Sequence, residues 1–120
     1  MFNILLAEDD MNFGSILKRE LEDESIFNVD HVFNGVEAVL SFKNRRYDFV
    51  LLDLRMPRLT GTDALRIIRT INAEVPVITF SGSAGNLERA ESIEAGAMRC
   101  LVKPFEIGEL KEAIRNHVLR

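Results

Sequence analysis

The chain alternates short, almost purely apolar runs with longer segments in which apolar residues recur every three or four positions. Each run is bounded by polar residues, glycine or proline, which is typical of strands buried on both faces of a parallel sheet. Strands are expected at residues 2–7, 27–33, 49–52, 74–80 and 98–102. The segments between and after them have the helical period. Helices are expected at residues 11–24, 36–42, 64–71, 86–95 and 107–118.

Strict alternation of strand and helix predicts an α/β domain with a parallel sheet and helices on both of its faces. All strands of such a sheet end at one edge, where open α/β sheets bind their ligands. That edge would receive five polar side chains, Glu8, Asp9, Asp53, Ser81 and Lys103. The fourth helix has the weakest apolar side, so we expect it to be the least firmly docked.

Composition narrows the class of protein. A chain of 120 residues suits one domain, and 47% hydrophobic residues exclude a disordered chain. The net charge of −4 argues against nucleic-acid binding, which requires a basic face. The first residues lack the basic region and long apolar core of a secretory leader, and no apolar run reaches roughly 20 residues. We therefore expect residues 1–120 to form one cytoplasmic domain that binds neither nucleic acid nor a membrane.

The carboxylates at the edge predict a metal site. Glu8, Asp9 and Asp53 would repel one another, and a hard divalent cation with oxygen ligands resolves the conflict. A site with few protein ligands suits Mg²⁺, with Mn²⁺ or Ca²⁺ as substitutes. The backbone carbonyl of Arg55 would add a further oxygen ligand.

The same edge suits phosphoryl transfer. A metal-bound aspartate such as Asp53 can act as a nucleophile and form an acyl phosphate. The Ser81 hydroxyl and the Lys103 ammonium would each neutralise or bind one oxygen of the phosphoryl group. The cradle for a phosphoryl group is thus present without a nucleotide-binding glycine motif.

Together these motifs resemble the receiver domain of two-component response regulators, and the resemblance covers the whole chain. Each motif is unspecific by itself, but their order and separations are specific. The matching segments are residues 4–9, 51–61, 76–82, 96–97 and 103–105.

The resemblance implies a doubly wound, flavodoxin-like sheet of order 2-1-3-4-5 in a three-layer α/β/α sandwich. It implies a phosphorelay switch in which Asp53 accepts a phosphoryl group from the phosphohistidine of a sensor histidine kinase or a phosphotransfer protein. Glu8 and Asp9 would hold Mg²⁺, Ser81 would move toward the phosphoryl group, and Lys103 would pair with it. The surface of the fourth helix, fifth strand and fifth helix would then change and meet an output domain, an output protein or a second copy.

One position departs from the family. Three residues before Lys103 the family usually carries an aromatic ring that turns inward during switching, and this chain has Cys100. We therefore expect phosphorylation to move the loop after Ser81 and the fourth helix without an aromatic rotation. The resemblance also marks Arg55 and Ser83 as positions that control the lifetime of the acyl phosphate.

The acidic and basic residues also have simpler interpretations. The run 8–10 suits the N-terminus of a helix, a task that we assign to Asp10. Asp53 and Lys103 would also suit a structural ion pair.

The remaining candidates have structural alternatives as well. Ser81 beside a glycine suits a turn, and Cys100 suits a small buried side chain. His31 and His117 are expected at the surface, and no cluster of histidine and cysteine indicates a zinc site.

Three functions compete. The leading one is the switch, which catalyses its own phosphorylation and dephosphorylation but is no enzyme toward a separate metabolite. A degenerate receiver that acts as a phosphorylation-independent interaction module is the second. The third is an aspartate-nucleophile phosphatase, which requires a second aspartate where this chain has Arg55.

Overall fold

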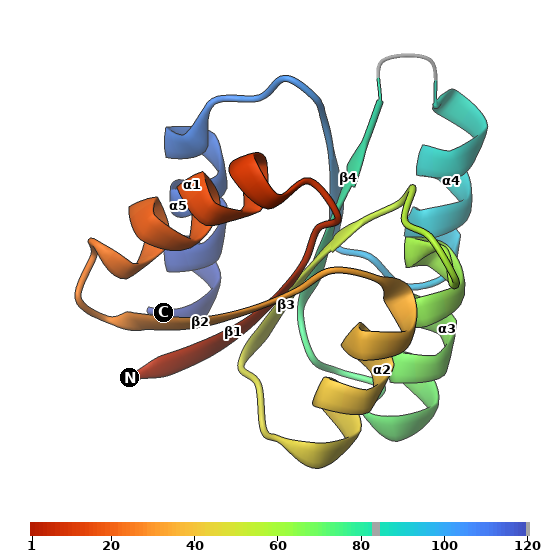
Figure 1. Cartoon of the computed structure of the whole chain (residues 1–120), viewed down its shortest axis with the longest axis horizontal. Helices are drawn as coiled ribbons and strands as arrows, with labels where there is room; N and C mark the ends of the chain where they lie inside the picture. Colours follow the sequence, from red (N-terminus) through yellow and green to blue (C-terminus); the bar gives the residue numbers. More distant parts are fainter. Residues whose placement is uncertain (83–84, 120) are drawn as a thin grey trace.

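The computed structural model describes residues 1–82 and 85–119, in which five parallel strands alternate with five helices (Figure 1). The strands are β1 (Phe2–Ala7), β2 (Phe27–Val32), β3 (Phe49–Asp53), β4 (Val77–Ser81) and β5 (Arg99–Val102). The helices are α1 (Met11–Glu22), α2 (Gly35–Asn44), α3 (Gly61–Ile71), α4 (Asn86–Glu94) and α5 (Ile107–Val118). The sheet has the order β2-β1-β3-β4-β5, which confirms the predicted doubly wound fold.

The inner strands β1, β3 and β4 contribute to two cores, which explains why they are apolar on both faces. Helices α1 and α5 cover one face, and α2, α3 and α4 cover the other (Figure 1). Buried members of the first core include Ile4, Leu6, Leu17, Phe49, Leu51, Phe80, Leu110 and Ile114. Buried members of the second include Leu5, Ala38, Phe42, Val50, Leu52, Leu65, Ile68 and Val77.

Side chains of loop residues cap the N-termini of three of the described helices. Asp10, Asn34 and Thr60 each accept a hydrogen bond from the backbone N–H three residues later, at 3.1, 2.9 and 3.2 Å. Such caps satisfy donors that have no partner within the helix. The Asp10 bond confirms the capping role expected for the third residue of the acidic run. Helix α4 follows Gly85 without a side-chain cap.

Strand β4 begins later than expected, at Val77 instead of residue 74. The side-chain oxygen of Asn72 accepts hydrogen bonds from the backbone N–H groups of Glu74 and Val75, at 2.8 and 3.0 Å. Those N–H groups are therefore used in a turn, and the sheet ladder starts only after them.

The apolar side expected for α4 does not face the sheet. Leu87 is 73% exposed and Ile93 is 47% exposed, and the one residue that α4 buries is Ser92. Helix α3, in contrast, buries Ala64, Leu65 and Ile68 among others. The helical period places Leu87, Ala90 and Ile93 on the apolar side of this helix, but all three are exposed, and the polar Ser92 is buried instead.

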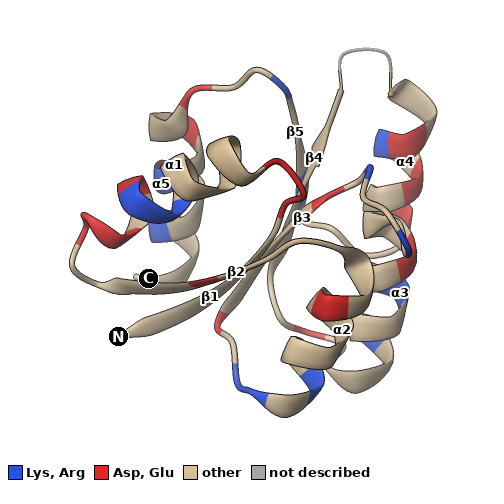
Figure 2. Ribbon diagram, viewed as in Figure 1, with Lys and Arg blue, Asp and Glu red and all other residues tan. Residues whose placement is uncertain are grey.

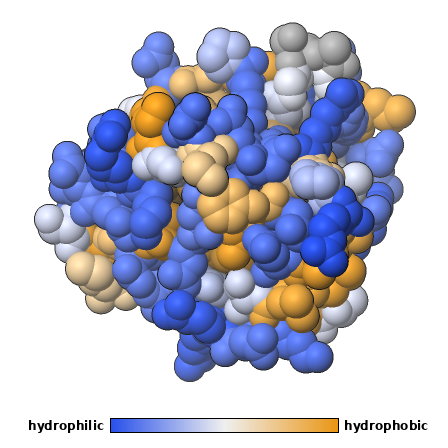
Figure 3. Space-filling view, in the orientation of Figure 1, coloured by the Kyte–Doolittle hydropathy of each residue, from blue (hydrophilic) through white to orange (hydrophobic). Residues whose placement is uncertain are grey.

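Apolar side chains also gather on the surface over α2 and α3 (Figure 3). Leu40, Ile67 and Ile71, which the helical period marked as apolar positions, are between 39% and 53% exposed. The period therefore overestimated the width of the buried stripe on both helices. No described helix has the length and apolar character required to cross a membrane.

Candidate functional site

Acidic residues lie together where β1 and β3 end, as Figure 2 shows. Sheet hydrogen bonding continues just past the strands and aligns the loops that follow. The backbone N–H of Glu8 donates to the carbonyl of Val32 at 3.0 Å, and the backbone N–H of Leu54 donates to the carbonyl of Phe80 at 2.9 Å. Lys103 N–H donates to the Ser81 carbonyl at 2.8 Å. The chain just past β1, β3 and β5 is therefore held against the ends of the neighbouring strands β2 and β4.

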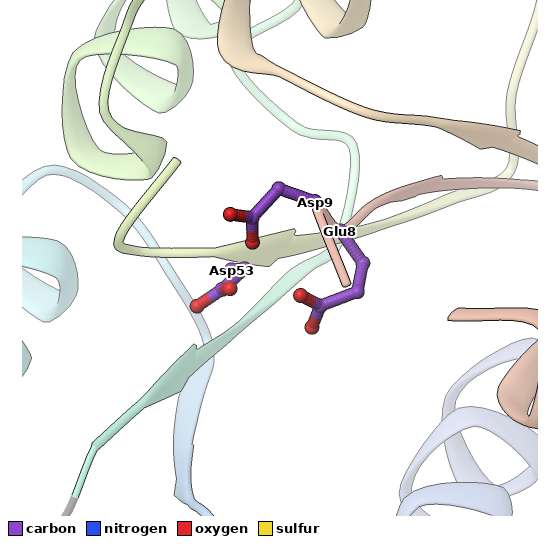
Figure 4. A group of neighbouring side chains, drawn as sticks. All are labelled: Glu8, Asp9 and Asp53. Atoms are coloured by element: carbon purple, nitrogen blue, oxygen red, sulfur yellow. The ribbon is translucent and has the colours of Figure 1, made fainter. Parts of the chain in front are cut away.

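Three carboxylates converge at this edge. Glu8, Asp9 and Asp53 each offer an oxygen, and these oxygens lie within 4.8 Å of one another (Figure 4). Glu8 and Asp53 are buried, whereas Asp9 is exposed. Asp9 and Glu8 are adjacent and still meet, because β1 has ended at Ala7 and the backbone is turning.

Lys103 reaches the same cluster from the loop after β5. Its ammonium donates to Glu8 Oε1 at 2.8 Å and to Asp53 Oδ2 at 3.2 Å. One ammonium thus faces three carboxylates, and Asp9 has no basic partner among the residues that the structure describes. The cluster keeps an excess of negative charge.

Burial dominates the electrostatics of Glu8. Burial raises the pKa of Glu8, the hydrogen bond from Lys103 lowers it and the charge of Asp53 raises it, and together these causes bring the pKa to about 7. Burial also acts to lower the pKa of Lys103, but the bonds and charges of Glu8 and Asp53 outweigh it and raise that pKa. The lysine is therefore a permanent cation at this edge.

Ser81 ends β4 with a buried hydroxyl. Its Oγ has no hydrogen-bond partner in the described part of the chain. An unpaired buried hydroxyl is unfavourable by about 1–3 kcal/mol, so an acceptor arriving at the edge would stabilise it.

Gly61 allows the loop after Asp53 to pack against the site. Its N–H donates to the Leu54 carbonyl at 3.0 Å, and a Cβ atom there would overlap the carbonyl of Asp53. The N–H of Arg55 donates to Asp53 Oδ1 at 3.4 Å. The short loop therefore restrains the orientation of the Asp53 carboxylate.

Cys100, Ser83 and Arg55 are the residues predicted to take part in switching or to control the acyl phosphate lifetime. Cys100 is partly exposed and lines a groove of about 320 Å³ between α4 and β5, so its interpretation as a fully buried side chain is wrong. Ser83 lies outside the described residues. Arg55 points to α4, where Nε and Nη2 bind Glu88 Oε1 at 3.0 and 2.6 Å.

Sequence patterns did not indicate two further contacts. The Lys103 ammonium lies over the ring of Phe13, 4.8 Å from its centroid. His31, expected at the surface, is partly buried beside Gly14, and its Nε2 lies 2.8 Å from the Glu8 carbonyl oxygen. An aromatic at helical spacing looks like any core residue, so the pattern carried no signal for the role of Phe13.

The donor set fits a divalent cation. Three carboxylates within 4.8 Å of one another, with one lysine to balance them, supply the hard oxygen ligands that Mg²⁺ prefers. The exposed Asp9 leaves the cluster accessible to water, which Mg²⁺ retains in its coordination shell.

Comparison with known proteins gives one family. A model of the response regulator receiver domain matches residues 4–115. The uncharacterized transcriptional regulatory protein YcbL of Bacillus subtilis is 34% identical over 116 residues, which cover 97% of this chain and 50% of that protein. The CpxR homolog of Haemophilus influenzae is 37% identical over 115 residues, covering 96% and 49%. The chain thus spans about half the length of these relatives.

Solved structures agree. The receiver domain of Francisella response regulator 1452 superposes with a TM-score of 0.89 at 29% identity, covering 97% of this chain and 95% of that one. The receiver domain of the sensor histidine kinase PA1611 from Pseudomonas aeruginosa has a TM-score of 0.83 at 32% identity, covering 96% and 95%. That structure has a magnesium ion coordinated in its active site cleft.

Proposed function

Because this chain belongs to the response regulator receiver domain family, we propose that Asp53 accepts a phosphoryl group and thereby switches the chain between two signalling states. The donor is the phosphohistidine of a sensor histidine kinase or of a phosphotransfer protein. The chain acts on no separate metabolite.

One observation carries the proposal. Asp53, Lys103 and Ser81 meet at one edge, and the buried Ser81 hydroxyl has no partner in the described structure. A phosphoryl group on Asp53 would bring oxygens that accept hydrogen bonds from both Ser81 and Lys103. A structural ion pair alone would have no use for the unpaired hydroxyl.

The transfer itself needs little covalent chemistry from the protein. A carboxylate oxygen of Asp53 attacks phosphorus as the N–P bond of the phosphoimidazole breaks, and the departing nitrogen keeps the bonding electron pair; with a proton on its other ring nitrogen, the group leaves as neutral imidazole. Lys103 neutralises charge on one phosphoryl oxygen, and Ser81 donates to another.

Glu8, Asp9 and Asp53 would hold the divalent cation, with the carbonyl of Arg55 as a further predicted ligand. When bound, Mg²⁺, or Mn²⁺ or Ca²⁺ in its place, supplies charge neutralisation for the phosphoryl oxygens. The relative with magnesium in its cleft supports this assignment.

The output surface is formed by α4, β5 and α5. Leu87, Ile93 and Met98 are exposed there and suit an apolar contact with an output domain, an output protein or a second copy of the chain. We place the signalling by this chain in the cytoplasm, because the relatives are named transcriptional regulatory proteins. The chain itself carries a net charge of −4, which disfavours direct binding of nucleic acid.

Incubation with acetyl phosphate or phosphoramidate, with and without Mg²⁺, tests the proposal. Intact-mass measurement should detect one phosphoryl group that requires Mg²⁺ and disappears in Asp53→Asn. Lys103→Ala should slow its formation about a hundredfold or more, because one charge-stabilising donor is lost. Asp63→Asn, which alters an exposed carboxylate of α3, is the matched control and should behave as the parent.

The other outcomes identify the competing functions. Steady hydrolysis of free phosphate esters would favour a phosphatase, although Arg55 stands where that class requires an aspartate. Absence of any adduct in the parent chain would favour a phosphorylation-independent interaction module.

A further inference from the structure

Lys103 has an aromatic neighbour as well as two carboxylates. Its ammonium lies 4.8 Å from the centroid of the Phe13 ring, within the range of about 6 Å over which a ring face attracts a cation. The same ammonium binds Glu8 and Asp53, at 2.8 and 3.2 Å. The ring therefore forms part of the immediate surroundings of the charge that the site uses.

The Phe13 ring is held in place by two other rings. It lies edge-to-face with Phe80 at a centroid distance of 6.4 Å and with Phe105 at 5.8 Å. Phe80 directly precedes Ser81, and Phe105 follows Lys103 by two residues. The backbone N–H of Phe13 donates to the side chain of Asp10, which caps α1. The ring thus has a defined position relative to the site.

A ring suits this position better than a third acidic partner would. The lysine side chain is long and flexible, and it is 28% exposed, so solvent competes for its ammonium. A ring face attracts the cation without using one of its N–H groups in a strong hydrogen bond. It also adds no negative charge to a site that already holds three carboxylates.

We propose that Phe13 is a positioning residue: its ring holds the Lys103 ammonium at the phosphoacceptor edge and leaves its N–H donors to the carboxylates and the phosphoryl group. The effect on phosphoryl transfer rests on the proposed function, whereas the effect on Lys103 itself does not.

The position of Lys103 is measured first in the unphosphorylated chain, by NMR of its ε-methylene group. The Phe13 ring should shift these signals upfield, and Phe13→Leu should return them toward the values of a solvated lysine. Phe2→Leu is the matched control, because Phe2 is a partly buried ring packed against the same core, and its described ring contact is with Phe27. It should leave the Lys103 signals unchanged.

Phosphorylation is measured next with fluorinated phenylalanines at position 13. Addition of one, two and three fluorine atoms weakens the negative ring face with little change in size. The rate with acetyl phosphate and Mg²⁺ should fall stepwise, by roughly three- to tenfold over the series. Phe13→Tyr should retain the parent rate, and Phe13→Leu should fall to the level of the trifluorinated ring.

A rate that stays constant along the fluorine series, together with Lys103 signals unaffected by Phe13→Leu, would assign Phe13 to packing alone and overturn the proposal. Failure of the parent chain to take up a phosphoryl group would instead overturn the proposed function. In that case the Lys103 signals still decide whether the ring positions the ammonium.

Discussion

Helices α4 and α5 lie on opposite faces of the sheet, and different kinds of contact hold them in place. Helix α5 buries Leu110, Ala113 and Ile114 in the core that it shares with α1. Helix α4 buries Ser92, and its large apolar side chains Leu87 and Ile93 face outward.

The contacts that hold α4 are polar. The Ser92 hydroxyl lies 2.9 Å from that of Thr79 in β4, and both residues are fully buried. Glu88 binds Arg55 from the loop after Asp53, and Arg69 of α3 donates to the Gly96 carbonyl at 2.7 Å, just beyond the helix. A polar contact can be exchanged for one with water, whereas displacing α5 would open the core. We therefore expect α4 to move more readily than α5.

The largest expected contrast comes from the same substitution in both helices. Leu110→Ala should lower the free energy of unfolding by about 2–5 kcal/mol, because it leaves a cavity in the core. Leu87→Ala should change it by less than about 0.5 kcal/mol, because Leu87 is mostly exposed. Urea denaturation measures both, and similar losses would mean that α4 is also held by apolar packing.

The buried hydroxyl pair should have the next largest effect. Ser92→Ala deprives the Thr79 hydroxyl of its nearest partner and should destabilise the protein by about 1–3 kcal/mol. Adding Thr79→Val removes the remaining hydroxyl, so the double variant should lose less than the sum of the two single variants. A double-mutant cycle by urea denaturation measures the difference. Additive losses would exclude the hydroxyl pair as a link between β4 and α4.

The Arg55–Glu88 ion pair should affect the local stability of α4 and not the stability of the whole domain. Its removal by Glu88→Gln should leave global stability unchanged but raise hydrogen exchange in the first turn of α4 by roughly two- to threefold. Arg66→Gln is the control, because Arg66 forms an exposed ion pair with Asp63 within α3 and has no described contact with α4. Equal exchange in the parent and in Glu88→Gln would show that the pair does not restrain α4.

The same pair predicts the smallest effect, a pH dependence. The hydrogen bond from Arg55 lowers the pKa of Glu88 from 4.5, so the contact is complete above pH 4.5 and is lost as the pH falls through the lowered value. Exchange in the first turn of α4, corrected for its intrinsic pH dependence, should therefore increase over this acidic range. Glu88→Gln should lack the change, and α5 should show none from this source.

Hydrophobic periodicity was sufficient to predict the strands, the helices and the parallel α/β class, whereas the strand order followed from the resemblance to receiver domains. The run Phe2–Ala7 and the helix Ile107–Val118 have the predicted bounds; Glu8 directly follows the strand, and Glu106 directly precedes the helix. The start of β4 was misplaced because the Asn72 side chain binds two backbone N–H groups in a turn. Side-chain bonds of this kind leave no mark in an apolar pattern.

The residues that meet at the site could also be predicted from the sequence. Parallel strands end at one edge whatever the details of packing, so the meeting of Asp9, Asp53 and Lys103 followed from the alternation of elements. Their roles required the resemblance to receiver domains, since the same residues also suit a structural ion pair.

By itself, therefore, the sequence determined the order of the elements, the two cores and the edge where the charged residues gather. Only the tertiary structure decided that Phe13 lies beside Lys103, that Ser92 rather than Leu87 faces the sheet, and that Arg55 binds Glu88. The physical reason is that burial of apolar surface is non-directional and follows local period, whereas polar and aromatic contacts depend on the distances and angles between elements remote in the chain.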